Sequence, residues 1–275
     1  MHRASIVSQT SIRLRGKAIA GAEDRQRKIA GFDQEVFSKS SILCIGAGGL
    51  ISHIAPNLVR KGLGQITLLD DDVVEASNLN RQRFYIKDIG RNKALALAEN
   101  LERECIATTE IRGIGFRLEE AIAREVDLDS GIVVCGVDNN PARVATSRYF
   151  RFRGIPVIFA GVSRDGDCGY VFVQEKHGPC IGCLYPDMAD DDRYPCPGTP
   201  AIADILQAVG SLAVYAVDTL LMKRARNWNY RRISLSDGTS DGASLMTPRP
   251  GCRMFATGPD KKVAGPDSHI STGER

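Results

Sequence analysis

The stretch SILCIGAGGLIS, residues 41–52, decides the fold class of this chain. Residues 41–45 form a short, fully apolar run, which is typical of a central strand in a parallel sheet. A glycine-rich turn follows at residues 46–49, and residues 52–61 then have helical spacing. Glycine lets the backbone approach a ligand closely, and the start of a helix offers free N–H groups to an anion. The stretch therefore predicts a strand, a turn and a helix that can hold the phosphates of a nucleotide.

Strands and helices alternate through the rest of the 275 residues. Further strands are expected at residues 65–69, 109–114, 132–137, 156–161, 170–174 and 231–235. Further helices are expected at residues 91–104, 119–125, 141–153 and 205–222. This alternation predicts an α/β fold with a doubly wound, Rossmann-like and mostly parallel sheet. An antiparallel extension on the C-terminal side and a crossover loop at residues 178–204 complete the expected architecture.

Composition and charge exclude several classes of protein. The 36 Lys and Arg residues nearly balance the 33 Asp and Glu residues, which argues against a dedicated nucleic-acid binder. A hydrophobic content of 43% rules out general disorder. The longest apolar stretch, residues 205–222, is interrupted by Gln207, Gly210 and Asp218, so we expect a buried helix rather than a membrane span. The N-terminal residues contain no long apolar run, so we expect no signal peptide and a cytoplasmic protein.

The glycine turn is an incomplete dinucleotide fingerprint. Gly46 and Gly48 occupy the first two positions of the G-x-G-x-x-G pattern, Gly49 follows, and Ile51 stands at the third position. Asp70 lies 24 positions after Gly46, at the end of the next strand, where an acid can hold a ribose hydroxyl. Taken alone, these residues are compatible with a binding site for any nucleotide or dinucleotide. They are also compatible with a glycine turn that binds no ligand and lies beside a solvated acidic residue at a strand end.

Six motifs in a fixed order indicate which kind of nucleotide-binding protein this is. GAGG at 46–49 is followed by LLDDD at 68–72, SNLNRQ at 77–82, a helix-borne Lys93, an Asp-Asn pair at 138–139 and C-x-x-C at 180–183. With this order the chain resembles the ThiF/MoeB/HesA adenylyltransferases of the ubiquitin-activating-enzyme-like superfamily, from Arg25 to Cys252. The resemblance implies an adenylation domain at residues 25–255, with a nucleotide-binding half at about 40–160 and a carrier-binding half at about 161–255. We expect a partly flexible N-terminal arm at residues 1–24 and a flexible tail at residues 256–275.

The family's reaction joins a carboxylate, typically the C-terminal glycine of a ubiquitin-like or sulfur-carrier protein, to AMP. The carboxylate attacks the α-phosphate of ATP and pyrophosphate leaves, so positioned cations and Mg²⁺ must offset the negative charge. The resemblance implies that Arg81 and Lys93 contact the phosphates and that Asn78 contacts the sugar or the phosphates. It implies that Asp70 binds the ribose, and that Asp138 coordinates Mg²⁺ with Asn139 beside it. Asp72 is implied to have a less defined role at the nucleotide. Arg25 matches an arginine that family members extend across a homodimer interface to the partner's ATP, so the resemblance also implies a homodimer.

Eight cysteines in such a protein point to free thiols or a metal site rather than to a disulfide framework. Cys180 and Cys183 are half of a thiolate zinc site, because tetrahedral zinc needs four ligands. In the resemblance Cys252 is the third ligand, and Phe255 stands where the fourth would be. Either another side chain completes the site or zinc has been lost; the candidates are Cys168, His177, Cys196 and His269. We expect three further cysteines to be small buried residues: Cys44, Cys105 and Cys135.

Cys196, in YPCPGTP, falls where some relatives carry a cysteine that takes the acyl group from AMP. A thiol attacks an acyl-adenylate as the thiolate, so it needs a lowered pKa or a nearby base, and none is evident from the sequence. The alternatives for Cys196 are a zinc ligand and an inert loop thiol.

The overall prediction is an ATP-dependent adenylyltransferase that activates a carrier protein's C-terminus. One alternative is a nicotinamide-dependent oxidoreductase, which would leave Arg81, Lys93 and Asp138 without a role; another is a non-catalytic carrier-binding scaffold. No rhodanese-like or ubiquitin-fold domain is recognisable, so we expect any sulfur donor or conjugating enzyme to be a separate protein. Sulfur transfer, conjugation through a cysteine thioester, and adenylation of a peptide or tRNA-linked group all stay open.

Overall fold

The computed structural model describes residues 10–163, 165–186, 201–238, 241–252 and 254. Within these residues one sheet has nine strands in the order β1-β4-β3-β2-β5-β6-β7-β8-β9. The strands are β1 (Ser11–Arg15), β2 (Ser41–Ile45), β3 (Gln65–Leu69), β4 (Glu110–Ile114), β5 (Ile132–Cys135), β6 (Val157–Val162), β7 (Cys168–Gln174), β8 (Tyr230–Ser234) and β9 (Gly242–Ser244). The helices are α1 (Gln34–Ser38), α2 (Gly49–Arg60), α3 (Lys93–Glu102), α4 (Leu118–Ala123), α5 (Asn140–Phe152), α6 (Ile181–Leu184) and α7 (Ala203–Leu221), with short 3-10 helices η1 (Gln26–Lys28), η2 (Ala76–Asn78) and η3 (Ile86–Asp88).

The middle of the sheet is parallel. Strands β4, β3, β2, β5 and β6 pair in parallel, whereas β1 on one side and β7 to β9 on the other run antiparallel. This confirms the predicted mostly parallel sheet with an antiparallel C-terminal extension. The chain leaves β2 toward β3 on one side and later returns to β5 on the other, so the strand order reverses between β2 and β5. In open α/β sheets, ligands bind outside the carboxyl ends of the strands at such a reversal.

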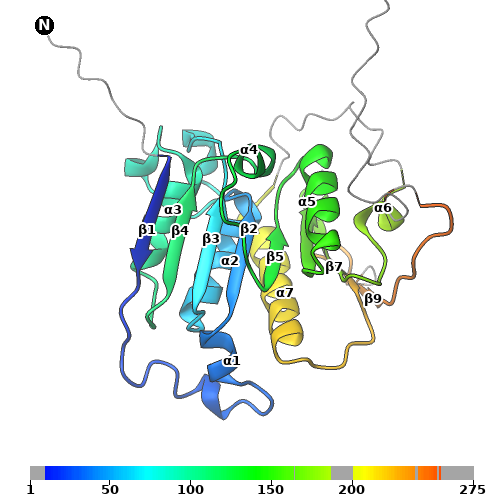
Figure 1. Cartoon of the computed structure of the whole chain (residues 1–275), viewed down its shortest axis with the longest axis horizontal. Helices are drawn as coiled ribbons and strands as arrows, with labels where there is room; N and C mark the ends of the chain where they lie inside the picture. Colours follow the sequence, from blue (N-terminus) through cyan, green and yellow to red (C-terminus); the bar gives the residue numbers. More distant parts are fainter. Residues whose placement is uncertain (1–9, 164, 187–200, 239–240, 253, 255–275) are drawn as a thin grey trace, which may run out of the picture.

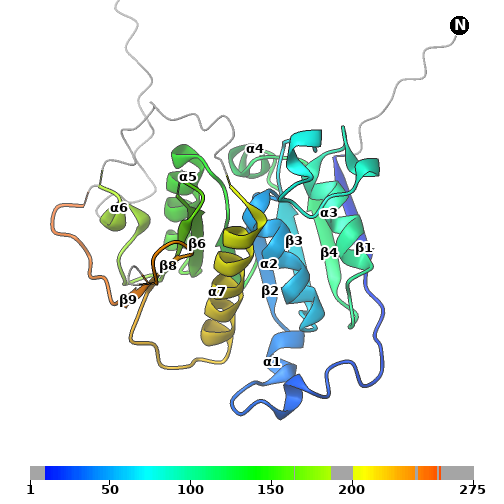
Figure 2. The same cartoon turned by 180° about the vertical axis from the view of Figure 1, so that it is seen from behind.

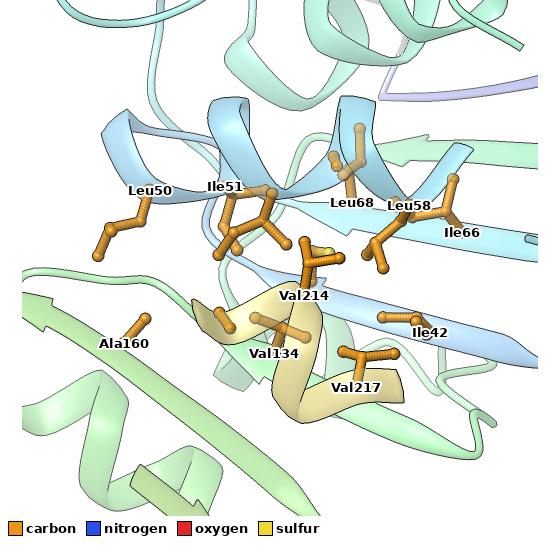
Figure 3. Close-up of a cluster of buried hydrophobic side chains, with 14 of the residues drawn as sticks. Ile42, Leu50, Ile51, Leu58, Ile66, Leu68, Val134, Ala160, Val214 and Val217 are labelled. Atoms are coloured by element: carbon orange, nitrogen blue, oxygen red, sulfur yellow. The ribbon is translucent and has the colours of Figure 1, made fainter. Parts of the chain in front are cut away.

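Helices cover both faces of the sheet. Helices α2, α3 and α7 lie on one face, and α4, α5 and α6 lie on the other (Figures 1 and 2). Figure 3 shows the larger core, in which Ile51 and Leu58 of α2 lie near Val214 of α7 and above the strands that carry Ile42 and Val134. Because β2 and β5 are covered on both faces, their side chains are buried along almost the whole strand, as the apolar runs predicted.

Ile51 occupies the position of the third fingerprint glycine, and the neighbouring strand accommodates it. Gly136 directly follows β5, and a Cβ atom built there would lie 2.9 Å from Ile51 Cγ1. The close contact between helix and strand, which a glycine on the helix provides in the full fingerprint, is made here by a glycine after the strand. The incomplete fingerprint therefore still brings α2 close to the sheet.

Helix α7 corresponds to the apolar stretch expected to be a buried helix. By length and composition it would suffice to cross a membrane, but 56% of its most apolar stretch is buried inside the protein. It packs against α2, β6 and β7. These contacts account for its apolar composition as that of a core helix.

The N-terminal segment differs from the expected arm, because residues 11–15 form the edge strand β1 on β4. Ile12 and Leu14 pack against the larger core, whereas Arg13 and Arg15 are exposed. This alternation is the period-2 pattern of a half-buried edge strand. At the other edge, β9 was also not predicted, and its residues are all exposed.

Candidate functional site

The glycine turn joins β2 to α2 at the carboxyl end of the sheet. Gly46 has a φ of +92°, a conformation that favours glycine. Gly48 is the N-cap of α2 and Gly49 its first residue, so the free N–H groups of the first helical turn face this end of the sheet. The loop after β5 lies beside it, since the N–H of Gly136 bonds to the carbonyl of Ile45 at 3.0 Å. The turn is thus placed at the reversal point between β2 and β5.

Asp70 holds the turn in place from the end of β3. Its carboxylate accepts hydrogen bonds from the backbone N–H of Ala47 at 2.6 Å and of Asp72 at 2.8 Å. Burial raises the pKa of Asp70 to about 6, although Lys93 and the two N–H groups favour its ionised form. A carboxylate with two oxygens has lone pairs left for a ribose hydroxyl. Asp70 can therefore serve the turn and a nucleotide together.

Two adjoining cavities open at this end of the sheet. The arginine cavity, of about 520 Å³, is lined by residues that include Asn78, Arg81 and Arg143. The glycine cavity, of about 720 Å³, is lined by residues that include Gly46 and Asp70. The residues that line both cavities form a shared wall: Gly49, Asp72, Gln82, Lys93, Gly136, Val137 and Asp138. The structure thus brings together the residues of five motifs that lie between positions 46 and 139.

Lys93, at the start of α3, lies in the shared wall and is paired with an acid. Its ammonium lies 2.8 Å from the Asp72 carboxylate, and its side chain is 12% exposed against 68% for Asp72. Asn92, the N-cap of α3, donates its side-chain amide to the carbonyls of Asp70 at 2.8 Å and Asp72 at 3.1 Å. The end of β3 and the start of α3 are therefore tied together, and Lys93 points into the site.

Arg81 lies in the loop that follows η2. Its Nη1 donates to the carbonyl of Ser77 at 2.7 Å and to the side chain of Asn80 at 2.9 Å. Asn78 is buried, and its side-chain oxygen accepts from the N–H of Glu75 at 3.0 Å. Asn78 therefore fixes the start of the loop, and the bonds at Nη1 leave the other N–H groups of the Arg81 fork for an anion.

Asp138 follows β5 and is exposed in the shared wall. Among the described residues, no hydrogen bond or ion pair engages its carboxylate. Asn139 is the N-cap of α5, and its side-chain oxygen accepts from the N–H of Ala142 at 2.9 Å. Mg²⁺ is bound through one or two carboxylates and substrate phosphates, so the uncommitted carboxylate of Asp138 fits such an ion, whereas Asn139 is engaged in the helix cap.

Two further polar side chains in the cavities were not singled out from the sequence. Arg143, on α5, lines the arginine cavity and donates to the carbonyl of Val137 at 3.1 Å. Gln82 lines both cavities, and its side-chain oxygen is buried without a hydrogen-bond partner. Arg143 follows Asn139 by one helical turn, so its spacing from the Asp-Asn pair was the signal that could have identified it.

Arg25 lies away from both cavities of its own chain. It is the exposed N-cap of η1, and the next residue, Gln26, donates to the carbonyl of Lys61 at 2.9 Å, just after the last residue of α2. In Figure 1 the neighbouring helix α1 lies at the opposite end of the molecule from α4, whose first residue, Leu118, lines the glycine cavity. Within one chain the structure does not bring Arg25 to the predicted site.

Three buried cysteines form a second cluster, near α6. The sulfur of Cys180 lies 3.7 Å from that of Cys183 and 3.6 Å from that of Cys252, and the N–H of Arg249 donates to Cys183 at 3.3 Å. Two thiolates on a tetrahedral zinc with Zn–S near 2.3 Å lie about 3.8 Å apart, so the three sulfurs fit one zinc ion. Burial, and to a smaller extent repulsion from Cys183, raises the pKa of Cys180 to about 12. A bound divalent cation would lower this pKa, because it stabilises the thiolate.

The fourth ligand does not come from the two described candidates. Among the residues with a described position, the cluster contains these three cysteines alone. Cys168 starts β7, whereas Gln174 at the other end of that strand accepts from the N–H of Ile181, beside the cluster. His177 is exposed. The remaining positions named from the sequence lie outside the described residues: Cys196, Phe255 and His269.

The chain is similar in sequence to known proteins. The chain is 30% identical over 168 residues to a SAMP-activating enzyme E1 of Haloferax volcanii, a match that covers 61% of each protein. It is 31% identical over 195 residues to a sulfur carrier protein adenylyltransferase of Thermus thermophilus, covering 68% of this chain and 72% of that protein.

Solved structures and a family profile extend the comparison. The structure of E. coli MccB with ATP has a TM-score of 0.67 at 19% identity and covers 81% of this chain and 68% of that chain, which shows a shared fold. The ThiF family profile matches residues 23–254. With that match over most of its length, the chain belongs to the ThiF family, in the ubiquitin-activating-enzyme-like superfamily.

Proposed function

We propose that this protein is an ATP-dependent adenylyltransferase that activates the C-terminal carboxylate of a ubiquitin-like or sulfur-carrier protein. One observation carries the proposal: Lys93 and Asp138 lie in a wall shared by two cavities, one with the glycine turn and Asp70, the other with Arg81. A nucleotide that lies across this wall would place its sugar by Asp70 and its phosphates between the cations and Asp138. The relatives named for adenylyl transfer to sulfur carriers support the same conclusion.

In the proposed reaction, a carboxylate oxygen of the carrier forms a bond to the α-phosphorus, and the bond from that phosphorus to the bridging oxygen of pyrophosphate breaks. The products are the acyl-adenylate and pyrophosphate, so no oxidant or reductant is needed. Arg81 and Lys93 stabilise the negative charge that builds on the phosphate oxygens and the leaving group. Asp70 orients the sugar. Asp138 would hold Mg²⁺, which when bound would supply further positive charge to the phosphates.

The decisive test is ATP–pyrophosphate exchange with carriers that end in Gly-Gly. We expect carrier-dependent exchange by the wild type, and loss of at least about 100-fold in the Asp138→Ala variant with carrier binding retained. Asp129→Ala, which removes an exposed acid before β5, is the matched control and should exchange normally. Absence of exchange with every carrier, together with tight binding of a nicotinamide dinucleotide, would contradict the proposal.

We further propose a homodimer in which Arg25 of one subunit completes the site of the other. Arg25 lies near the C-terminal end of α2, the end opposite to the glycine turn of the same chain. The segment around Arg25 exposes Ile19 (58%) and Ile29 (56%), which a second copy could cover. Mixing the inactive variants Arg25→Ala and Asp138→Ala tests this arrangement. If Arg25 acts across the interface, each mixed dimer contains one intact site and exchange returns; if it acts within its own chain, no activity returns.

We also propose that Cys180, Cys183 and Cys252 hold a structural zinc ion. The spacing of the sulfurs and their burial support this, as does the backbone N–H that donates to Cys183. The cluster lies at α6, which contacts the end of β7 through Gln174, and Cys252 joins it from about 70 residues further along the chain. Zinc would therefore fasten the carrier-binding half of the chain and take no part in the reaction at the ATP site.

A further inference from the structure

A buried histidine contacts the loop that carries Arg81. His53 lies on α2, one helical turn after Gly49, and its side chain is 5% exposed. Its Nε2 atom lies 3.0 Å from the carbonyl oxygen of Arg81. A carbonyl oxygen can only accept, so Nε2 carries the proton and donates it. Helix α2 therefore faces the cavities with its first turn and holds the Arg81 loop with its second.

The loop makes few other hydrogen bonds to the body of the protein among the described residues, and its partly buried Leu79 packs against the larger core. The N–H groups of Arg81 and Gln82 bond to the carbonyl of Asn78 at 3.1 and 2.9 Å, within the loop itself. Beyond the loop, Phe84 packs its ring into the larger core. Asn78 and Phe84 thus fix the two ends of the loop. Within the described residues, the bond from His53 is the one hydrogen bond that joins the backbone of residues 79–83 to α2.

The surroundings of His53 show that packing alone does not explain a histidine here. The ring's Nδ1 is buried without a hydrogen-bond partner, which costs free energy. An apolar side chain would avoid that cost, and α7 lies close enough to pack on it, since a Cβ atom on Gly210 would lie 3.3 Å from His53 Cβ. Burial lowers the pKa of His53, the bond to the Arg81 carbonyl opposes this and the charge of Arg83 assists it, so the net effect favours the neutral ring. What the histidine adds over an apolar residue is the N–H that it donates to Arg81.

We propose that His53 is a positioning residue that fixes the backbone of the Arg81 loop and thereby aims the Arg81 guanidinium at the arginine cavity. The benefit to catalysis rests on the proposed function, because it assumes that Arg81 acts on the phosphates of ATP. The contact itself can be measured in the folded protein without any activity. Two different measurements therefore separate a failure of this proposal from a failure of the proposed function.

The test uses a matched pair of variants in the full chain. His53→Gln places an amide N–H near the position of Nε2, and His53→Met has a similar length without a donor. Hydrogen exchange followed by mass spectrometry reports the protection of the backbone amides in the peptide that spans residues 79–84, with α3 as an internal reference. We expect exchange in the loop to rise about tenfold in His53→Met and to stay near the wild-type rate in His53→Gln.

The kinetic measurement is ATP–pyrophosphate exchange. We expect His53→Met to lower kcat about tenfold with little change in the KM for the carrier, and His53→Gln to restore most of it. Equal loop protection in the two variants would overturn the proposal, whether both match the wild type or both lose protection. If the wild type itself shows no exchange with any carrier, the proposed function fails, while the hydrogen-exchange comparison still decides whether His53 holds the loop.

Discussion

The ammonium of Lys93 and the carboxylate of Asp72 lie 2.8 Å apart in the wall that the two cavities share. The ion pair partly neutralises Lys93, the cation proposed to act on the phosphates. Asp72 is 68% exposed, so the pair is screened by water and is weak. Phosphate oxygens can therefore replace Asp72 as the partner of Lys93 at small cost.

We predict that Asp72→Asn strengthens ATP binding about threefold when measured without Mg²⁺. In this variant, the ion pair between Lys93 and Asp72 no longer has to break before Lys93 can contact the phosphates. Isothermal titration calorimetry gives the Kd. Asp71→Asn removes a charge from the neighbouring exposed position and is the control. The same gain in Asp71→Asn would show that net charge, rather than the ion pair, sets the affinity.

We predict that Arg81→Lys lowers the rate of pyrophosphate exchange about 100-fold, although the charge is kept. The Arg81 fork donates through Nη1 to Ser77 and Asn80, which aligns the guanidinium, and an ammonium lacks this planar fork. Steady-state exchange assays measure the loss. Arg83→Lys, two residues on and exposed, should retain activity; an equal loss there would contradict a specific role for Arg81.

The pKa of Asp70 predicts how the stability of the protein depends on pH. Because the folded state raises this pKa from its usual 3.8 to about 6, the folded protein holds the proton more tightly than the unfolded chain does. The contribution of Asp70 to the free energy of unfolding is then fully present below pH about 4 and falls as the pH rises through about 6, by up to about 3 kcal/mol. Urea unfolding of the wild type and Asp70→Asn between pH 4 and 7 gives this difference. A wild-type free energy that rises with pH relative to Asp70→Asn would contradict it.

Zinc analysis tests the cysteine cluster. We predict about one zinc ion per chain, lost in Cys180→Ser with a fall in Tm of about 10 °C, which corresponds to about 3 kcal/mol for a domain of this size. Atomic absorption and thermal unfolding provide the two readouts. Cys168→Ser, at the far end of β7, should keep both the metal and the Tm. A wild-type protein purified without zinc and unaffected by chelators would rule the site out.

Cys196 lies outside the described residues, so chemistry has to test its role. We predict that Cys196→Ala keeps pyrophosphate exchange but no longer forms a carrier adduct that thiols cleave, because adenylation precedes transfer to a thiol. Non-reducing gels and mass spectrometry detect the adduct. Loss of zinc in this variant would instead identify Cys196 as the fourth metal ligand, and an unchanged adduct would identify it as inert.

Motif order predicted much of the site, because short segments that each carry a polar group at a strand end are brought together by a parallel sheet. Asp70 and Asp138 are of this kind, and Lys93 joins them from the start of α3; all three line the cavities. Arg25 is different: the role proposed for it depends on a second subunit, so its position within one chain does not test that role. The fold class was predictable for the same reason, since buried parallel strands appear as apolar runs.

Other features depend on partners far along the chain, which sequence patterns do not show. The edge strand β1 exists because Ile12 pairs with Gly113, about 100 residues later, and a lone five-residue segment gives only a weak signal. His53 appears in the sequence as one residue of an apolar helix, and its role depends on a contact with the Arg81 carbonyl 28 positions away. Asn92 likewise has the sequence signature of an ordinary helix cap, and only the structure reveals its two bonds to the carbonyls of Asp70 and Asp72, just after β3.

Those two bonds bear on how the site would receive a nucleotide. Because Asn92 bonds the first turn of α3 to the carbonyls of Asp70 and Asp72, the backbone beneath Lys93 is held in place by the protein itself. Little conformational entropy remains to be lost there on association, and only the terminal ammonium has to swing from one oxygen to another. In the proposed function, the nucleotide would therefore bind to a preorganised surface, and Asn92 would contribute to its affinity without touching it.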